Sequence, residues 1–289
     1  MANLKDIKRR IGSVKNTQKI TNAMKLVSAA KFARANSAVE ASRPYTENFK
    51  DMVGLLLKTE GNNIKSPLVK SNKERKSLVI GLGSDRGLCG PLNATVSKEI
   101  SSFTNSKATE GVEFDYFAFG KKIASFYKLE GISSNGTIEK FFDRPSFDAC
   151  KQEMDKFVSM FSAGEYDRIY VVYPQFKSAL EQNPVVEQLL PVEASAGSDE
   201  DSDVEDVIVE PALGEFVDGL FERLVYIHFY NVVLNTAASE HGARMTAMDA
   251  ATNNSKSVIK KLTLEYNRAR QAAITTELTE IVSGAQALD

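Results

Sequence analysis

The chain has 289 residues, of which 43% are hydrophobic, and its formal net charge is -2. This length and apolar content are enough for one or two ordinary cores, which excludes disorder as the default. The near-neutral charge excludes a uniformly basic nucleic-acid binder, but the charge is unevenly distributed. Residues 1–35 hold nine lysines and arginines and a single acid, Asp6, whereas residues 178–222 hold thirteen acids and no basic residue. The sequence therefore begins as a cationic rod and later contains an anionic stretch.

Cysteine content and hydropathy indicate which cellular compartment the chain occupies. Only Cys89 and Cys150 are present and they are far apart in sequence, so we expect two reduced thiols and no disulfide. The first residues lack the apolar run of a signal peptide, and no stretch of about 18 apolar residues could span a bilayer. We therefore expect any membrane association to occur through partners.

The N-terminal segment, residues 1–58, is predicted to be a coiled-coil helix. Pro44 lacks an amide hydrogen, so we expect the helix to kink or end near Arg43 and to resume over residues 48–58. The apolar stripe that would face a partner helix recurs every three or four positions and then drifts. Its members are Leu4, Ile7, Ile11, Val14, Ile20, Met24 and Val27.

In residues 75–195 the spacing of apolar residues changes, and this segment is predicted to form a Rossmann-like α/β domain. Helical patterns over residues 120–129 and 147–162 alternate with strand patterns, which indicates a mostly parallel sheet. The strand candidates are short runs of apolar, β-branched and aromatic residues. They lie at residues 78–82, 112–119 and 169–173.

The C-terminal helix is the most informative segment. An acidic linker, residues 196–211, is predicted to precede it, and no proline occurs in residues 212–289. A helix over residues 212–286 would be on the order of 110 Å long. Apolar or small residues recur along it at alternating steps of four and three, which is the heptad seam of a coiled coil. The seam comprises Leu220, Leu224, Ile227, Asn231, Leu234, Ala238, His241, Met245, Met248, Thr252, Ser255, Ile259, Leu262, Tyr266, Ala269 and Ala273.

A coiled coil of this length requires a partner, and we expect the N- and C-terminal helices to pair in an antiparallel arrangement. Polar residues interrupt the seam on both helices, which predicts a weakly packed coiled coil. Such packing is expected where other proteins surround the coiled coil. The interruptions are Gln18, Thr21, Asn231, Thr252 and Ser255.

The glycine-rich loop at residues 81–87 lies between a predicted strand and a predicted helix, where a phosphate-binding loop would be. Its spacing, G-x-G-x-x-x-G, departs from the dinucleotide fingerprint, and the next strand lacks a clear acidic residue for a ribose. A structural turn is the favoured interpretation, and a Rossmann-like nucleotide-binding enzyme is the alternative. The sequence also has no G-x-x-x-x-G-K-[ST] loop for ATP phosphates.

Other catalytic chemistry finds no support in the sequence. The only histidines, His228 and His241, lie on the predicted long helix, and His241 falls on its seam. Without clustered histidines and cysteines a zinc site is not expected. We therefore expect no catalytic residue, no metal and no cofactor.

The basic N-terminal run has two non-enzymatic interpretations. It could contact nucleic acid as part of a coiled-coil scaffold, or it could be the outer face of a helix inserted into an acidic protein cavity. Phe32 is the only aromatic residue before position 44. Since single-strand readers stack bases on aromatic rings, only nonspecific phosphate contact remains for the first interpretation.

Three stretches resemble the signatures of a known family. They are residues 16–25 (NTQKITNAMK), 84–90 (SDRGLCG) and 268–277 (RARQAAITTE), followed by a matching end at residues 280–285 (EIVSGA). In this order they resemble the gamma subunits of F-type ATP synthases. The resemblance runs from end to end and is strongest over the first 60 and last 50 residues.

The resemblance implies an antiparallel coiled coil of the two termini standing on an α/β foot. The coiled coil would enter the cavity of a hexamer of alpha and beta subunits, and the foot would sit with the epsilon subunit on the membrane-embedded ring of c subunits. Rotation of the ring would couple proton transport to ATP synthesis in the hexamer. The chain itself would be non-catalytic, would bind no nucleic acid, and would lie peripherally on the cytoplasmic side of a bacterial inner membrane.

The resemblance implies roles for individual residues that match the family motifs. Met24 matches a methionine near the beta subunits, and Arg270 with Gln271 matches a pair that contacts a beta loop. Lys25 is a neighbouring candidate for the same partner. The motif containing Asp85, Arg86, Gly87 and Cys89 maps to the foot, where a structural role is favoured over contact with epsilon. No cysteine-bearing insertion or transit peptide like those of chloroplast relatives is present, which implies a bacterial, redox-insensitive subunit.

Overall fold

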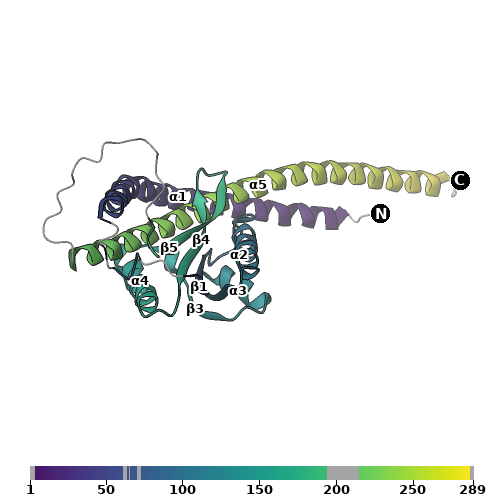
Figure 1. Cartoon of the computed structure of the whole chain (residues 1–289). Coiled ribbons are helices and arrows are strands. Elements are labelled where there is room, and N and C mark those ends of the chain that lie inside the picture. The colour runs from purple at the N-terminus through teal and green to yellow at the C-terminus, as the bar shows by residue number, and fades with distance from the viewer. Residues whose placement is uncertain (1–3, 61–63, 65, 70–72, 194–214, 287–289) are drawn as a thin grey trace. The chain divides into compact units, whose positions relative to one another are not determined.

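The computed structural model describes residues 4–60, 64, 66–69, 73–193 and 215–286. The chain divides into two compact units (Figure 1). Unit 1 comprises Met1–Ala29 and Arg244–Asp289, and unit 2 comprises Ala30–Ala243. The acidic linker predicted for residues 196–211 lies outside the described residues, and the division into four segments made from the sequence stays a prediction.

Two long helices belong to both units. Helix α1, Leu4–Glu60, has 57 residues, and helix α5, Glu215–Gln286, has 72. Helix α1 continues through Pro44, so of the two outcomes expected there, a kink or an end near Arg43, the end is wrong. A proline removes one helical hydrogen bond, and the buried Val39 and Val53 on either side of it keep this part of α1 packed.

Unit 2 contains one five-stranded sheet with the order β3-β2-β1-β4-β5. Strand β1 pairs in parallel with β2 and β4, β2 pairs in parallel with β3, and only the β4–β5 pair is antiparallel. The expected mostly parallel α/β fold is confirmed. The strands are β1 Lys76–Leu82, β2 Glu113–Phe119, β3 Ser134–Ile138, β4 Arg168–Phe176 and β5 Gln182–Leu190.

The central strands are those that the sequence predicts. In β1 the last six residues are buried, as expected for a parallel strand covered on both faces. The two edge strands, β3 and β5, were not predicted. The sequence of β3, SNGTI, has no apolar run, and β5 contains Pro184, a residue that sheets tolerate mainly at an edge.

Helices cover both faces of this sheet. Helix α2, Leu92–Ala108, and α3, Lys121–Leu129, pack on one face, where Ile100 and Ile123 meet Val79 of β1. Helix α4, Phe147–Ser162, and the first part of α5 pack on the other face. There the rings of Phe119 in β2 and Phe229 in α5 lie 5.3 Å apart. Unit 2 is therefore a three-layer α/β structure with α5 built into its core.

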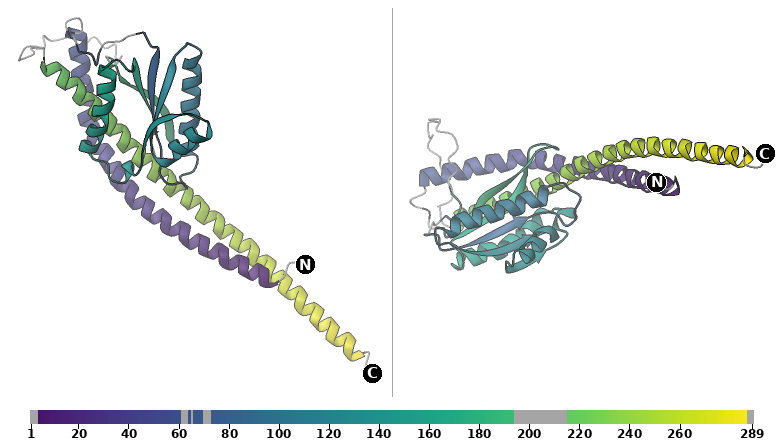
Figure 2. Two further views of the ribbon diagram at one scale, coloured as in Figure 1. Left: turned by 90° about the horizontal axis from the view of Figure 1, so that it is seen from below. Right: turned by 90° about the vertical axis from the view of Figure 1, so that its right-hand side faces the viewer.

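Unit 1 is an antiparallel pair formed by the first part of α1 and the last part of α5. Figure 2 shows that α5 continues beyond the N-terminal end of α1 as a single helix. The predicted seam is confirmed, since its positions from Leu224 to Ala273 are all buried or half-buried. The buried residues of unit 1 are few, and half of them carry hydroxyl groups: Ile7, Thr21, Ser28, Arg244, Met248, Thr252, Ser255 and Leu262.

Candidate functional site

The features to consider in the described part of the chain are surfaces that partners could contact. Among the residues that the structure describes, no group of three or more His, Cys, Asp or Glu side chains could hold a metal ion. None of the helices in the described part of the chain is long and apolar enough to cross a membrane. The candidate site therefore consists of the predicted contact residues and the surfaces around them.

In unit 1, Met24 and Lys25 lie half-buried on α1. The Lys25 Nζ lies 2.6 Å from Oδ1 of Asp249 on α5, so the ammonium group forms an ion pair within the rod. This hydrogen bond and the Lys25 charge hold the pKa of Asp249 below its usual value. The structure thus places Lys25 in a contact between the two helices, which the sequence did not predict.

Arg270 and Gln271 lie exposed on α5 of unit 1. Thr21 and Thr252 lie opposite each other across the pair, and stepping along both helices from them places Leu4 level with Ala269. Residues beyond 269 on α5 therefore have no partner in the described part of α1. This single-helical stretch also exposes large apolar side chains, with exposed fractions from 49% to 68%: Ile274, Leu278, Ile281 and Val282.

In unit 2, Asp85 ties together three segments of the chain. Its Oδ1 accepts a hydrogen bond from the backbone N–H of Lys121 at 3.2 Å, and its Oδ2 accepts one from the backbone N–H of Lys140 at 2.8 Å. One carboxylate therefore caps the first turn of α3 and fixes the chain after β3. This geometry supports the structural role that the sequence favoured for Asp85.

The rest of this motif forms a turn that satisfies its own polar groups. Asn93 Nδ2 donates to Ser84 Oγ at 2.8 Å and to Cys89 Sγ at 3.2 Å. The Ser84 hydroxyl donates to the backbone oxygen of Arg86 at 2.7 Å. Cys89 is 1% exposed, and Gly87 is half-buried in the same turn. The cysteine is thus a packing residue of the loop.

The glycines of the loop allow close packing inside the protein. A Cβ on Gly83 would lie 2.6 Å from the Ile123 side chain of α3. A Cβ on Gly120, whose φ is 99°, would lie 2.2 Å from the Gly83 carbonyl oxygen. Since the protein itself occupies the space that these glycines leave, the structural interpretation of the loop is favoured over nucleotide binding.

A groove in unit 2 collects positive charge from separate segments. Its cavity volume is about 510 Å³, and its apolar wall includes Leu234 of α5. Lys31 pairs at 3.7 Å with Asp143, the single acid that lines it. The cations around it come from α1, the motif loop and the segment before α4: Lys31, Arg34, Arg86 and Arg144. This cationic groove is suited to an acidic partner segment.

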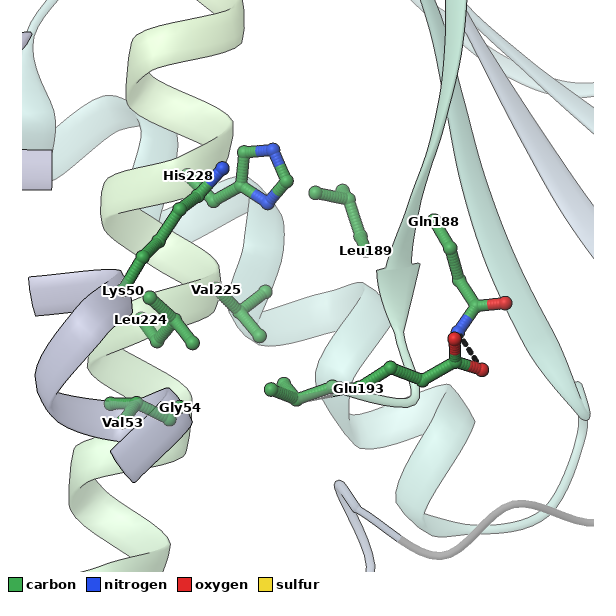
Figure 3. Close-up of a pocket in the computed structure, with 10 residues that line it drawn as sticks. Lys50, Val53, Gly54, Gln188, Leu189, Glu193, Leu224, Val225 and His228 are labelled. Atoms are coloured by element: carbon green, nitrogen blue, oxygen red, sulfur yellow. Dashed lines mark hydrogen bonds between the residues drawn. The ribbon is translucent and has the colours of Figure 1, made fainter. Parts of the chain in front are cut away.

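A smaller cavity lies where α1, α5 and β5 meet. Lys50 and His228 reach into it from the two helices, and Leu189 from the strand (Figure 3). Gln188 donates from Nε2 to Glu193 Oε1 at its rim, at 2.9 Å. The cavity volume is about 110 Å³, well below the roughly 300 to 1,000 Å³ of typical ligand pockets. It is too small for an ordinary substrate.

Comparison with known proteins identifies the family. A family model described as ATP synthase matches residues 3–288. The ATP synthase gamma chain of Geobacter sp. strain M21 is 42% identical over 292 residues, covering 100% of this chain and 99% of that protein. The chain belongs to the ATP synthase gamma-chain family. The gamma chain of Flavobacterium psychrophilum is also 42% identical, again covering 100% of this chain and 99% of the relative.

Solved structures share the fold of this gamma chain. A chain of the Euglena gracilis mitochondrial ATP synthase, described as OSCP/F1/c-ring in rotational state 3, superposes with a TM-score of 0.68 at 17% identity. The alignment covers 99% of this chain and 94% of that chain. A chain from the rotor of the same enzyme gives a TM-score of 0.66 at 16% identity, covering 94% and 98%.

The chain is thus an ATP synthase gamma chain, and it shares the fold of chains from ATP synthase rotor and F1/c-ring structures. Family membership favours this interpretation over the two alternatives drawn from the sequence, the Rossmann-like enzyme and the nucleic-acid scaffold. Sequence reasoning missed two features of the site, the acceptor of Lys25 and the cationic groove. The first had a signal, since Lys25 and Asp249 carry opposite charges beside the predicted seam, where coiled coils place interhelical ion pairs.

Proposed function

We propose that this gamma chain transmits rotation of a membrane ring of c subunits to a hexamer of alpha and beta subunits, and so couples proton transport to ATP synthesis. The observation that carries the proposal is the end of α5. It continues past α1 as a single helix and exposes Ile274, Leu278 and Ile281 close to Arg270 and Gln271. Contiguous exposed apolar side chains mark interaction surfaces, and a hexamer cavity would enclose this one.

The contacts with beta are assigned to two places on unit 1. Met24 lies half-buried on α1, beside the exposed Val27 and Leu26, so an apolar partner surface can reach it. Arg270 and Gln271 are exposed and free of the other helix. A guanidinium group and an amide can bond carboxylates and carbonyls in one rotational state and release them in the next.

Unit 2 is proposed to be the foot, in contact with the epsilon subunit and the ring of c subunits. Its cationic groove fits an acidic segment of one of the partner subunits, because three arginines and Lys31 surround it with a single carboxylate, Asp143. Attachment to the membrane would occur only through partners, on the cytoplasmic side of a bacterial inner membrane. Asp85, Gly87 and Cys89 would stabilise the foot, and Arg86 would face the groove.

Catalysis is proposed to belong to the hexamer. The chain has no phosphate loop of the ATP-binding type, and the glycines of its loop pack against Ile123 and Gly120. The chain would therefore act on ATP chemistry only by favouring one conformation of each catalytic site over another.

Reconstitution tests the proposal. Alpha and beta subunits would be combined with and without the purified chain, and the complex then joined to the membrane sector in sealed vesicles. We expect the chain alone to hydrolyse no ATP, and ATP-driven proton uptake to appear only when the chain is present. ATP hydrolysis that follows the isolated chain through successive columns would contradict the proposal, as would proton uptake without the chain.

A further inference from the structure

The middle of unit 1 has little apolar packing to set the axial register of its two helices. From Thr21 to Ser28 of α1 the buried side chains are those two hydroxyls, and Thr252 and Ser255 are buried on α5. Met248 is the large apolar residue buried beside them. Small hydroxyl side chains fill space almost equally well after a slip, so packing alone specifies the register poorly.

Two polar contacts cross the pair in this region. The hydroxyl oxygens of Thr21 and Thr252 lie 2.7 Å apart, and Lys25 Nζ lies 2.6 Å from Asp249 Oδ1. Lys25 is four residues after Thr21 on α1, and Asp249 is three residues before Thr252 on α5. Since the helices are antiparallel, the two contacts lie on successive turns of the same face.

The threonine contact gives each hydroxyl proton an acceptor. Thr252 Oγ1 also lies 2.7 Å from the Met248 carbonyl oxygen, and Thr21 Oγ1 lies 3.1 Å from the Gln18 carbonyl oxygen. Each hydroxyl has one proton, so one threonine donates to the other across the pair while the other donates to a carbonyl of its own helix. The contact is a short relay between the two helices, in a buried position where an unmatched hydroxyl is costly.

A slip of one helical turn would break both contacts. Moving α5 by four residues in one direction places Met248 opposite Thr21 and Met245 opposite Lys25. Moving it the other way places Lys256 opposite Thr21. A buried hydroxyl would then face a thioether or an ammonium group, and Lys25 would lose its carboxylate. One-turn slips of this kind, about 5.4 Å, are a known mode of helix displacement.

We propose that Lys25–Asp249 and Thr21–Thr252 form a polar clasp that fixes the axial register of α1 and α5 in unit 1. The four residues are positioning residues, which hold Met24 of α1 and the contact residues of α5 at matched heights along the rod. Buried polar groups are an established means of specifying register in coiled coils. For Lys25 this assigns a role inside the rotor in place of contact with beta. The consequence for coupling rests on the proposed function.

Register can be read directly by cross-linking in the full chain. Gln18→Cys with Ser255→Cys places a pair in the observed register, three residues from Thr21 and Thr252 on each helix. Gln18→Cys with Ala251→Cys places a pair that meets only after a one-turn slip. The native Cys89 and Cys150 are buried and stay in place. We expect the first pair to close much faster than the second on oxidation.

Charge variants then test the clasp. We expect Asp249→Lys to lower the ratio of in-register to shifted cross-linking about two- to fivefold, as expected for loss of a solvent-accessible ion pair. The swap of Lys25→Asp with Asp249→Lys should restore the ratio. Lys260→Asp, at an exposed cation of the same helix, is the matched control and should change nothing. An unchanged ratio in Asp249→Lys would overturn the clasp.

The assembled enzyme gives a second readout. Protons pumped per ATP should fall in Lys25→Asp and in Asp249→Lys, and should recover in the swap. If Lys25 instead acts by touching beta, Asp249→Lys would be neutral and the swap as defective as Lys25→Asp, which would overturn the assignment. A wild-type complex that fails to pump would reject the proposed function, while the cross-linking ratio would still test the clasp.

Discussion

Glu187 of β5 and His228 of α5 join the sheet of unit 2 to its long helix, with Oε2 and Nε2 2.6 Å apart. The hydroxyl of Tyr173 donates to the other carboxylate oxygen, Oε1, at 2.8 Å. Burial by itself raises the pKa of Glu187. The hydrogen bond and charge of His228, the bond from Tyr173 and the charge of Lys50 outweigh it and hold the pKa below its usual value.

This pair predicts that unit 2 loses stability in acid. A carboxyl whose pKa is lowered by folding contributes stability above its unfolded value, here 4.5, and that stability is lost as the pH falls through the folded pKa. We expect Glu187→Gln to destabilise unit 2 at pH 7 by about 1 to 3 kcal/mol and to flatten the loss of stability below pH 4.5. Urea unfolding monitored at several pH values measures both effects. Glu130→Gln, at an exposed position, is the control, and a parallel pH profile in the Glu187 variant would contradict the prediction.

The Asp85 carboxylate predicts a structural defect in the motif loop. Asp85→Ala leaves the amides of Lys121 and Lys140 without their acceptor, and we expect a loss of about 1 to 3 kcal/mol in the free energy of unfolding. Asp85→Asn keeps one acceptor oxygen and should lose less. Asp51→Ala, at an exposed position on α1, should be near neutral. A stable Asp85→Ala chain that fails only to bind epsilon would instead place this residue in an interface.

At Met24 we predict different effects for an apolar substitution and a charged one. The flexible apolar side chain can slide past different beta surfaces without a directional bond, and Met24→Leu should behave similarly. A lysine there could form a charge-assisted bond of roughly 1.5 to 3 kcal/mol in one rotational state, which would raise the barrier to leaving that state. We expect Met24→Lys to pump fewer protons per ATP than Met24→Leu, with assembly intact. Equal pumping in the two complexes would reject this role.

Substitution of Arg270 is predicted to change ATP turnover while nucleotide affinity at a single site stays the same. If its guanidinium group latches onto beta in one state, Arg270→Ala should change multi-site ATP turnover far more than nucleotide binding at a single site, because the rod selects among conformations. Arg270→Lys should recover turnover only in part, since lysine lacks the planar fork. An exposed side chain with no partner contributes only about 0 to 1 kcal/mol, so unchanged steady-state turnover in Arg270→Ala would leave the residue as helix surface.

The sequence predicts most of the fold because its strongest patterns agree with the tertiary structure. The heptad positions around Thr252 and Leu262 are buried as expected, and the apolar runs of β1 and β4 become central strands. The edge strands β3 and β5 were not predicted because an edge strand needs few apolar residues. The helix does not end at Pro44, because a single missing hydrogen bond does not end a helix that is packed on both sides of the proline.

The candidate site was predictable only where one residue acts alone. Family motifs located Asp85 and Arg270, but no pattern in the sequence shows that the Asp85 carboxylate reaches Lys121 and Lys140, which are 36 and 55 residues away. The cationic groove likewise gathers arginines from segments that are far apart in the chain. Such convergence depends on the sheet order and the crossing of helices, which local periodicity does not encode.

The exposed end of α5 affects how stable the unassembled subunit is toward local unfolding and proteolysis. From residue 263 to residue 284 nearly every side chain is exposed, and helices without tertiary contacts are marginally stable in water. This stretch therefore has the lowest opening free energy on the helix, and in the unassembled subunit proteases and amide exchange reach it first. Enclosure by partners, as in the proposed function, would remove that vulnerability, so we expect assembly to protect this stretch from proteases and from amide exchange.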